Sequence, residues 1–348
     1  MDARTLDDIP RHKWEKGWHT EVDSQHLFID TCVQLWSDCD FGKLNRYGVT
    51  AYLQTTFMPF DDPLRALDAM ADWWRIAREY PEVRVALTAT DIEEAHRNKQ
   101  AAVILGTQGG DFLGQELTRL EMFQRMGLRV VMPVYNVRNA LADGCLEPGN
   151  AGISKLGRRF VTECNRLGLV IDCTHVGERS TLDIMEASTQ PVLFTHSNPK
   201  AICDVPRNIS DDQIRRCAAG GGVVGACSWA PLLMRPGRNG RPQLADFIDA
   251  IAYIADLVGI DHVGIGTDMS HGTYPDGDRI RGKGLAGTYD QLIEPNPRSR
   301  LRAVEGFDNW GQILDVAEAL RQRGFAPADV DKIFGGNFLR VFRAVWGA

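Results

Sequence analysis

The sequence lacks a membrane-spanning apolar run, a secretory signal and any long basic cluster. A helix that crosses a bilayer needs about 20 mostly apolar residues in succession, and no segment of the 348 residues supplies them. The first ten residues are polar and acidic, without the apolar segment of a signal peptide. Basic residues gather only in short turns, at residues 235–241 and 279–283, and the formal net charge is −7. We therefore predict a cytoplasmic protein with no membrane or nucleic-acid partner.

Cysteine-pair motifs are absent as well. The eight cysteines include no Cys-x-x-Cys spacing. Several lie in apolar segments, as Cys173 and Cys227 do, which is typical of buried free thiols rather than of a disulfide framework. With 44% apolar and 24% charged residues, the chain is predicted to be globular, with enough apolar sequence for one large core or two modest ones.

Two apolar runs in the middle of the chain each end in a histidine. Residues 169–175 and 191–196 are typical of short buried strands, and they close with His175 and His196. The intervening residues 179–188 have helical spacing, so the unit is predicted to be a strand, a helix and a parallel strand. Because ligands bind at the carboxyl ends of parallel strands, we predict that the two histidines share a metal or catalytic site.

The rest of the chain repeats this alternation of strand and helix. Six further strands are predicted at residues 27–31, 48–54, 101–106, 128–134, 222–227 and 262–267. Helices are predicted at residues 64–80, 91–99, 116–126, 155–167, 210–219, 244–258, 309–323 and 327–346. Eight strands favour an α/β fold of one (β/α)8 TIM barrel over a doubly wound sheet. This single domain would span residues 1–348, with a leader over 1–26, a loop over 270–297 and C-terminal helices over 309–346 packed on the barrel.

Polar side chains follow most of the predicted strands. We expect all of them to converge on one pocket at the carboxyl ends of the strands, and they are Cys32, Gln34, Gln108, Tyr135, His175, His196 and Asp268. His271, three residues beyond Asp268, is an additional candidate ligand.

Five segments resemble the renal (membrane) dipeptidases, a metallopeptidase family of the amidohydrolase superfamily. They are Asp-Cys-Thr-His at 172–175, Phe-Thr-His-Ser at 194–197, Pro-Arg-Asn-Ile-Ser-Asp-Asp at 206–212, Gly-Ile-Gly-Thr-Asp at 264–268 and Gly-Gly-Asn-Phe-Leu-Arg at 335–340. With the strand order, the resemblance covers nearly the whole chain. It implies the amidohydrolase type of (β/α)8 barrel, a metal cofactor and hydrolysis of a dipeptide-like substrate, and a homodimer is a further expectation because the family often dimerises.

The resemblance also implies roles for individual residues. In the family, two divalent metals share a bridging carboxylate and a bridging hydroxide. His175, His196 and Asp268 stand at ligand positions, and Arg207 stands where the substrate's carboxylate binds. We include Asn208, next to Arg207, among the predicted substrate-binding residues.

Other family positions have changed in this chain. Cys32 and Gln34 replace a His-x-Asp pair, Gln108 replaces the bridging Glu, and Tyr135 replaces a substrate-contacting His. Two carboxylates are thereby lost, and neutral amides cannot offset the charge of two close cations. We therefore predict at most one divalent ion, most consistent with Zn²⁺ on the two histidines.

The third ligand of such an ion stays open at this point. Asp268, the Gln108 oxygen and a Cys32 thiolate are candidates, and the thiolate is the softest of them. Cys32 could instead be a small apolar residue at a strand end. A third alternative needs no metal, with Cys32 as nucleophile, His175 or His196 as base and Asp268 as the group that orients the base.

Three functions compete on this evidence. The first is a metal-dependent hydrolase of a dipeptide-like or N-acyl amino-acid amide, in which Asp268 moves the proton. Tyr135 would bind substrate and donate a hydrogen bond to the developing oxyanion, unless it only covers the barrel core. The second is a related barrel recruited to different chemistry on a small carboxylate metabolite. The third is a non-catalytic barrel that binds a ligand or partner.

Overall fold

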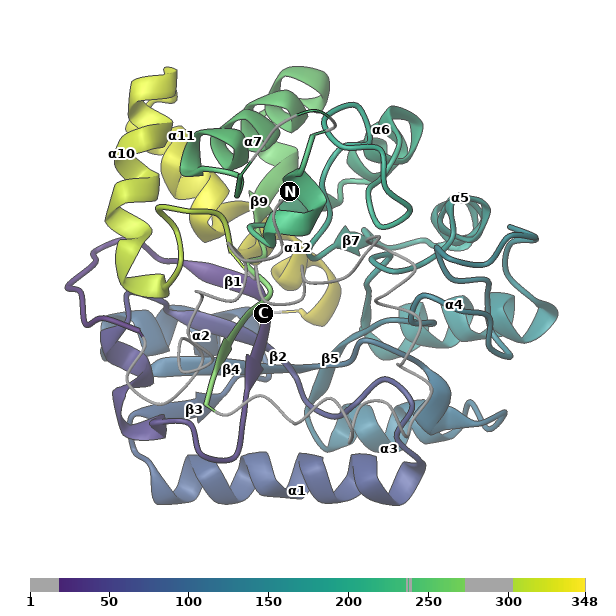
Figure 1. The fold of residues 1–348 in the computed structure, drawn as a ribbon. Helices are drawn as coiled ribbons and strands as arrows, with labels where there is room; N and C mark the ends of the chain where they lie inside the picture. The colour runs from purple at the N-terminus through teal and green to yellow at the C-terminus, as the bar shows by residue number, and fades with distance from the viewer. Residues whose placement is uncertain (1–18, 236, 238–239, 273–302, 348) are drawn as a thin grey trace.

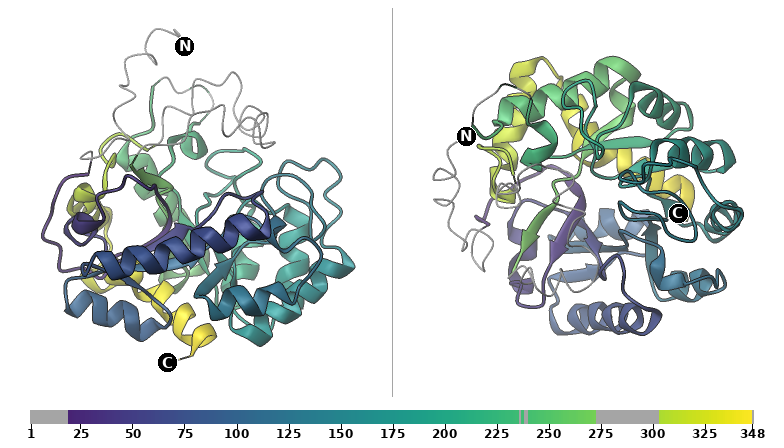
Figure 2. Two further views of the ribbon diagram at one scale, coloured as in Figure 1. Left: turned by 90° about the horizontal axis from the view of Figure 1, so that it is seen from below. Right: turned by 45° about the vertical axis from the view of Figure 1, so that its right-hand side comes forward.

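The computed structural model describes residues 19–235, 237, 240–272 and 303–347. Strands form the centre and helices surround them (Figure 1), and two further views show the same arrangement (Figure 2). The strands are β1 (Ile29–Leu35), β2 (Ala51–Thr55), β3 (Val83–Val85), β4 (Ala101–Gly106), β5 (Leu128–Val131), β6 (Val170–Ile171), β7 (Leu193–Phe194), β8 (Val223–Ala226), β9 (Val263–Ile265) and β10 (Met269–His271). The α-helices are α1 (Pro63–Glu79), α2 (Ala89–Arg97), α3 (Arg119–Arg125), α4 (Lys155–Leu167), α5 (Glu178–Ala187), α6 (Asp211–Ala219), α7 (Leu244–Val258), α10 (Ile313–Arg323), α11 (Pro327–Asp331) and α12 (Asn337–Trp346).

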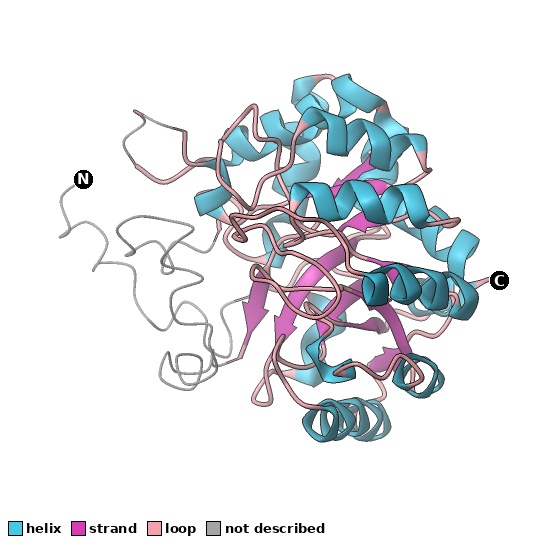
Figure 3. Ribbon diagram, turned by 90° about the vertical axis from the view of Figure 1, so that its right-hand side faces the viewer, coloured by secondary structure: helices cyan, strands magenta, loops and turns pink. Residues whose placement is uncertain are grey.

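Every strand pair among the described residues is parallel. One sheet has the order β10-β1-β2-β4-β5-β6, with β3 beside β4, and a second has the order β7-β8-β9. The eight predicted strands are all present, in the strand-and-helix alternation of a (β/α)8 barrel (Figure 3). The α/β barrel prediction is confirmed by the solved structure compared below.

The structure corrects the predicted bounds in several places. Strands β3 and β10 were not predicted, and β10 includes Ser270 and His271, which the prediction placed in a loop. The strands before the two histidines are only two residues long each. Residues 1–18 of the predicted leader, the loop beyond residue 272 and the basic turn at 279–283 lie outside the described residues, and the single-domain assignment stays a prediction.

Two helices have the predicted bounds and others do not. The helices predicted at 116–126 and 309–323 begin three and four residues later, and a π-helical segment, Lys332–Gly336, divides the one predicted at 327–346 into α11 and α12. Helix α4 begins after Ser154, whose hydroxyl accepts the Gly157 N–H at 3.0 Å, and it ends at Gly168 in the left-handed conformation. Its bounds and those of α7 equal the predicted ranges. None of the described helices combines the length and the apolarity that crossing a bilayer requires.

The C-terminal helix closes the end of the barrel opposite the histidines. Asn337 donates to the Val263 carbonyl at 2.8 Å, which holds the start of α12 against β9. A Cβ atom on Gly264 would lie 2.2 Å from Phe338 Cε2, so glycine is needed for this contact. The Gly-Gly-Asn-Phe segment therefore has a packing role at the amino ends of the strands.

A buried carboxylate spans the seam between β6 and β7. Only one bridge, Asp172 to Leu193, joins these strands. The Asp172 carboxylate accepts the N–H groups of Thr174 and Thr195 at 2.9 and 3.0 Å and the Thr195 hydroxyl at 2.6 Å. Side-chain hydrogen bonds thus continue the barrel where the backbone ladder is short.

A second buried carboxylate spans the seam between β9 and β1. Asp30 is fully buried and accepts the Thr267 N–H at 2.8 Å, the Thr267 hydroxyl, the Trp310 indole N–H at 2.8 Å and the Cys32 N–H at 3.3 Å. Burial raises the pKa of Asp30 to about 6, and these hydrogen bonds keep it from rising further. At neutral pH the group is mostly ionised and acts as a pure acceptor.

We expect Asp30→Asn to lower the free energy of unfolding by about 2 to 4 kcal/mol at pH 7, because the new NH₂ group would face the Thr267 and Trp310 donors. The deficit should grow by roughly 2 to 3 kcal/mol as the pH falls to 4. The folded pKa of Asp30 is raised, so the stability that its protonation gives the wild type is present at low pH and is lost as the pH rises through 6.

Urea denaturation across this pH range measures both effects. Asp256→Asn on the exposed face of α7 is the matched control and should follow the wild type. A deficit that is the same at pH 4 and pH 7 would contradict the assigned pKa.

Candidate functional site

Four of the predicted rim residues form one hydrogen-bonded group. Cys32 and Gln34 lie in β1, Gln108 follows β4, and Asp268 lies between β9 and β10. The Gln34 amide donates to Asp268 Oδ1 at 2.6 Å. The Ser270 hydroxyl donates to Gln34 Oε1 at 2.8 Å, so the amide nitrogen of Gln34 is directed toward Asp268.

The thiol of Cys32 lies at the centre of this group. Its Sγ is 3.5 Å from Asp268 Oδ1, 3.3 Å from the Gln108 amide nitrogen and 3.9 Å from the Gln34 amide nitrogen. Gln108 also donates to the Thr55 hydroxyl at 2.8 Å. Burial, followed by the negative charge of Asp268, raises the pKa of Cys32 well above its usual value, so in the absence of a cation the group is a thiol. The raised pKa and the burial of Cys32 count against a free thiolate nucleophile at neutral pH.

The two histidines face each other beside this group. His175 Nε2 lies 3.1 Å from His196 Nε2. Asn136 Oδ1 can only accept, so His175 Nδ1 donates to it at 2.6 Å. The Thr195 hydroxyl donates to Asp172, so its oxygen accepts from His196 Nδ1 at 2.8 Å.

This hydrogen bonding assigns the tautomer of both rings. Each ring carries its proton on Nδ1, and the two Nε2 lone pairs converge. Burial, followed by the positive charge of Arg207, lowers the pKa of His175 and of His196 well below the usual value, so both imidazoles are neutral. Facing lone pairs of neutral imidazoles are the donor set that a divalent metal takes from histidine.

Backbone conformation places two of these side chains directly. His175 and Asp268 have φ values of 65° and 57°, in the left-handed region that residues other than glycine rarely adopt. Such strain gathers at functional sites, where the surrounding structure holds it in place.

A pair of metal ions does not fit these residues. Gln34 and Gln108 direct N–H donors, not carboxylates, at Asp268 and Cys32, and a cation at these positions would meet the positive end of both amides. The cavity beside Cys32, Gln108 and His196 measures only about 10 Å³, roughly the room that one water needs.

A single ion fits better. Within the described part of the chain, one ligand atom from each of Cys32, His196 and Asp268 lies within 4.8 Å of the other two, and His175 adjoins His196. The set contains nitrogen, sulfur and oxygen donors, which suits Zn²⁺.

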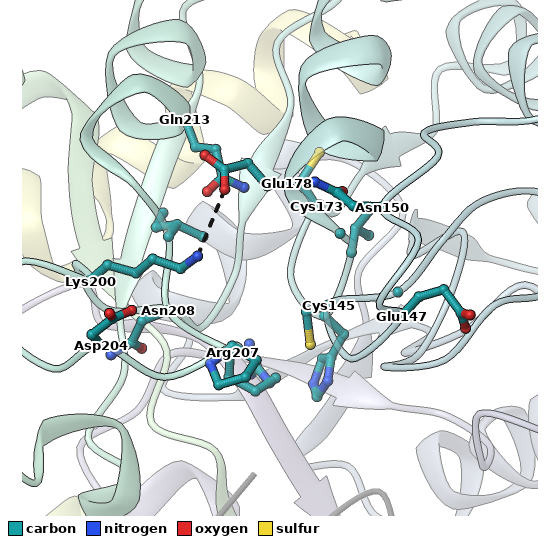
Figure 4. Close-up of a pocket in the computed structure, with 16 residues that line it drawn as sticks. Cys145, Glu147, Asn150, Cys173, Glu178, Lys200, Asp204, Arg207, Asn208 and Gln213 are labelled. Atoms are coloured by element: carbon teal, nitrogen blue, oxygen red, sulfur yellow. Dashed lines mark ion pairs between the residues drawn. The ribbon is translucent and has the colours of Figure 1, made fainter. Parts of the chain in front are cut away.

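A larger cavity of about 290 Å³ opens beside His175 and Arg207. In Figure 4, Arg207 and Cys145 lie on one side of it, and Lys200 and Glu178 form an ion pair on the other at 3.8 Å. Arg207 is only 2% exposed and donates through one nitrogen to the His196 carbonyl at 3.2 Å. Its Nε and Nη1 have no hydrogen-bond partner among the described residues. Buried guanidinium N–H groups that lack a protein acceptor and lie beside a cavity are suited to a carboxylate ligand.

The remaining predicted residues are placed differently. Tyr135 stacks on His175 with ring centroids 4.0 Å apart, so it does reach the site. Asn208 borders the cavity, but its amide donates to the Cys203 and Leu232 carbonyls and accepts the Asn198 N–H. Its side chain therefore connects the segments that contain these three residues.

His271 lies in a different environment from the ligand group. It is fully buried and packs against the rings of His19 and Tyr47, with centroids 5.1 and 5.3 Å away. The structure places it in an aromatic cluster and not among the gathered ligand atoms, so it is not supported as an additional ligand.

Sequence reasoning missed the residues that orient the histidines. Asn136 and Thr195 each occupy a position next to a predicted rim residue, but their roles depend on contacts with His175, 39 residues away, and with Asp172, 23 residues away. Cys145 and Lys200 were also missed, because both lie in loops, which carry no periodic signal. Glu178, at the start of α5, was missed because its partner Lys200 is distant in sequence.

Comparison with known proteins gives a consistent result. A sequence model described as membrane dipeptidase (peptidase family M19) matches residues 18–294. Dipeptidase tcpJ of Claviceps purpurea is 27% identical over 300 residues, covering 85% of this chain and 61% of that protein. Dipeptidase aclJ of Aspergillus oryzae is 26% identical over 277 residues, covering 77% and 58%. This chain thus spans about three fifths of the length of these relatives.

A solved structure shares the fold over nearly the whole chain. An amidohydrolase from Pseudomonas aeruginosa superposes with a TM-score of 0.83 at 27% sequence identity, covering 93% of this chain and 97% of its own. The amidohydrolase type of barrel predicted from the sequence is confirmed by this likeness.

Metal stoichiometry tests the charge argument. We expect the purified chain to bind at most one divalent ion, and the triple variant Cys32→His, Gln34→Asp, Gln108→Glu to bind two. The variant restores two carboxylates and an imidazole, and a bridging carboxylate lets two cations share a hydroxide. Gln108→Glu alone should gain less, since it restores the bridge without the other ligands.

Elemental analysis after equilibration with Zn²⁺ measures the stoichiometry. Gln190→Glu, in the turn before β7, serves as a control for added charge. Two ions in the unmodified chain would overturn the charge argument, and one ion in the triple variant would show that the shape of the pocket also excludes the second.

Proposed function

Since the chain belongs to the membrane dipeptidase family, peptidase family M19, we propose that it is a hydrolase that uses one divalent ion to cleave the amide bond of a dipeptide-like or N-acyl amino-acid substrate. The observation that carries the proposal is the convergence of two neutral imidazole lone pairs 3.1 Å apart. The family implies a divalent metal, and this pair is where the chain offers it nitrogen ligands. The named dipeptidases among its relatives support the choice of substrate.

His175, His196 and Asp268 would hold the ion, with Cys32 as a further ligand. The Gln108 amide directs its nitrogen, not its oxygen, toward Cys32, which favours the sulfur over the Gln108 oxygen as the additional ligand. When bound, Zn²⁺ polarises a carbonyl and activates a water as nucleophile at neutral pH.

The chain's own residues would bind the substrate and move the proton. Arg207 would bind the substrate's carboxylate through an N–H group that has no protein partner, that of Nε or of Nη1, which fixes the amide relative to the histidines. Asp268, held in place by the Gln34 amide, would take the proton from the attacking water and pass it to the leaving amine. Tyr135, stacked on His175, would donate a hydrogen bond to the carbonyl oxygen as charge develops there.

A second candidate function follows from the two glutamines. Gln34 and Gln108 present N–H donors where the family has carboxylates, and such donors would suit an anionic group of a small carboxylate metabolite. The barrel would then perform different chemistry on that metabolite. Binding of the metabolite with no amide hydrolysis, in a chain that carries its metal, would favour this alternative.

Removal of the ion tests the proposed hydrolase. We expect the Zn²⁺-loaded chain to hydrolyse members of a panel of dipeptides and N-acyl amino acids, and chelation to abolish the activity until Zn²⁺ is restored. His196→Ala should lose both bound zinc and at least 100-fold in kcat/KM, since it removes one of the two facing nitrogens. His26→Ala, a surface histidine that pairs with Asp331, is the control. Hydrolysis that continues after complete removal of the metal would contradict the proposal.

Substrate affinity tests the role of Arg207. Arg207→Lys replaces a planar two-point donor by a point charge, and we expect a loss of about 1.5 to 3 kcal/mol in binding. This corresponds to a rise in KM of roughly 10- to 150-fold. Arg216→Lys, an exposed residue paired with Asp212, is the matched control. An unchanged KM would mean that Arg207 only holds its loop to the His196 carbonyl.

A further inference from the structure

Asn136 connects the loop after β5 to the ring of His175. It directly follows Tyr135, is fully buried and has a φ of 57°. Its Oδ1 accepts from His175 Nδ1 at 2.6 Å, a short and well-formed hydrogen bond. No other acceptor is recorded for this ring nitrogen among the described residues.

The oxygen of the Asn136 amide is within reach of a second donor. The Cys145 thiol donates to the same Oδ1 at 3.3 Å, whereas the amide nitrogen is buried and has no partner among the described residues. A flipped amide would direct its NH₂ group at the Cys145 sulfur and at His175 Nδ1, and His175 would then carry its proton on Nε2, so the amide orientation and the tautomer are coupled. Leaving a buried NH₂ group without an acceptor is unfavourable, so such a group in a folded protein calls for an explanation.

The loop at residues 144–146 packs on Asn136 and His175 together. The Leu146 N–H donates to the Asn136 carbonyl and the Cys145 N–H donates to the His175 carbonyl, both at 2.8 Å. A Cβ atom on Gly144 would lie 2.1 Å from the Asn136 carbonyl carbon, so only glycine allows this contact. The backbone of both residues is therefore held from the same side.

We propose that Asn136 is the positioning residue that fixes His175 in its Nδ1–H tautomer, so that the Nε2 lone pair is directed at the metal. An amide oxygen is an acceptor only, so it excludes the tautomer whose proton would occupy Nε2. A carboxylate at this position would have no NH₂ group, but its charge would favour a protonated ring. An amide keeps the ring neutral and leaves its own NH₂ group without a partner. Partners of this kind change metal affinity by about 10- to 100-fold. The zinc part of this inference rests on the proposed function, whereas the tautomer part does not.

Two substitutions distinguish loss of the acceptor oxygen from a disturbance of the backbone. Asn136→Gly removes the acceptor and tolerates the positive φ. Asn136→Asp keeps an acceptor oxygen, tolerates the same backbone and removes the orphan NH₂ group. Asn165→Asp, in a contact with Thr189, adds the same charge as Asn136→Asp without touching His175 and is the control.

The tautomer is read by ¹⁵N NMR of histidine-labelled, metal-free protein, with the His175 signals assigned by their loss in His175→Gln. We expect the Nδ1–H form in the wild type, in Asn136→Asp and in Asn165→Asp. Asn136→Gly should show a mixture or the Nε2–H form. Zinc affinity, measured by competition with a chromophoric chelator, should fall about 10- to 100-fold in Asn136→Gly and be kept or raised in Asn136→Asp.

The outcomes distinguish this inference from the proposed function. A pure Nδ1–H tautomer in Asn136→Gly would overturn the positioning role, even in a chain that binds zinc tightly. A wild type that binds no zinc but shows the expected tautomers would overturn the proposed function and leave the positioning role intact. If Asn136→Gly does not fold, the zinc affinity of Asn136→Asp tests the proposal instead. Weaker zinc binding in Asn136→Asp, but not in Asn165→Asp, would contradict it.

Discussion

Two buried carboxylates, Asp30 and Asp172, hold together both the barrel and its site. Asp172 lies where a single bridge joins β6 and β7, and Asp30 lies between β1 and β9, which share no ladder among the described residues. Each carboxylate accepts donors from the opposite strand end. Asp172 also receives the Thr195 hydroxyl, which in turn accepts from His196. Asp30 receives the Cys32 N–H and both donors of Thr267, the residue before Asp268. The groups that close the barrel are therefore the groups that orient the candidate ligands, and loss of either carboxylate would affect stability and site geometry together.

The chemistry of the site follows from a balance of charge within this frame. Of the three carboxylate positions that the resemblance to the family implies, this chain keeps only Asp268. The site also contains the thiol of Cys32 and two neutral imidazoles. The amides of Gln34 and Gln108 fill the vacated positions with N–H donors, and the Gln34 amide satisfies Asp268. Arg207 borders the cavity, and its Nε and Nη1 have no acceptor among the described residues. Such a site suits one cation and one carboxylate ligand better than it suits two cations.

Much of the fold could be predicted because its signals are local. Apolar runs and capping residues determine where elements begin and end, and the ranges of α4 and α7 follow from Ser154, Gly168 and Gly259. The convergence of the strand-end residues was also predictable, since parallel strands direct their carboxyl ends to one edge. The short strands before His175 and His196 were predicted too long, because burial of a chain segment does not require it to pair with a neighbour. β10 was missed because its pairing with β1 joins residues more than 230 positions apart.

The sequence by itself determined which donor atoms the site has. The types and order of Cys32, Gln34, Gln108, His175, His196, Arg207 and Asp268 are fixed by the chain, and with them the loss of two carboxylates. Only the tertiary structure decided which atoms of these residues face one another. The tautomers of the histidines depend on Asn136 and Thr195, and the orientation of Gln34 depends on Ser270. Whether Arg207 Nε and Nη1 find an acceptor among the described residues depends on how its loop packs. A hydrogen bond depends on distance and direction in space, and these contacts join segments whose separation along the chain carries no record of either.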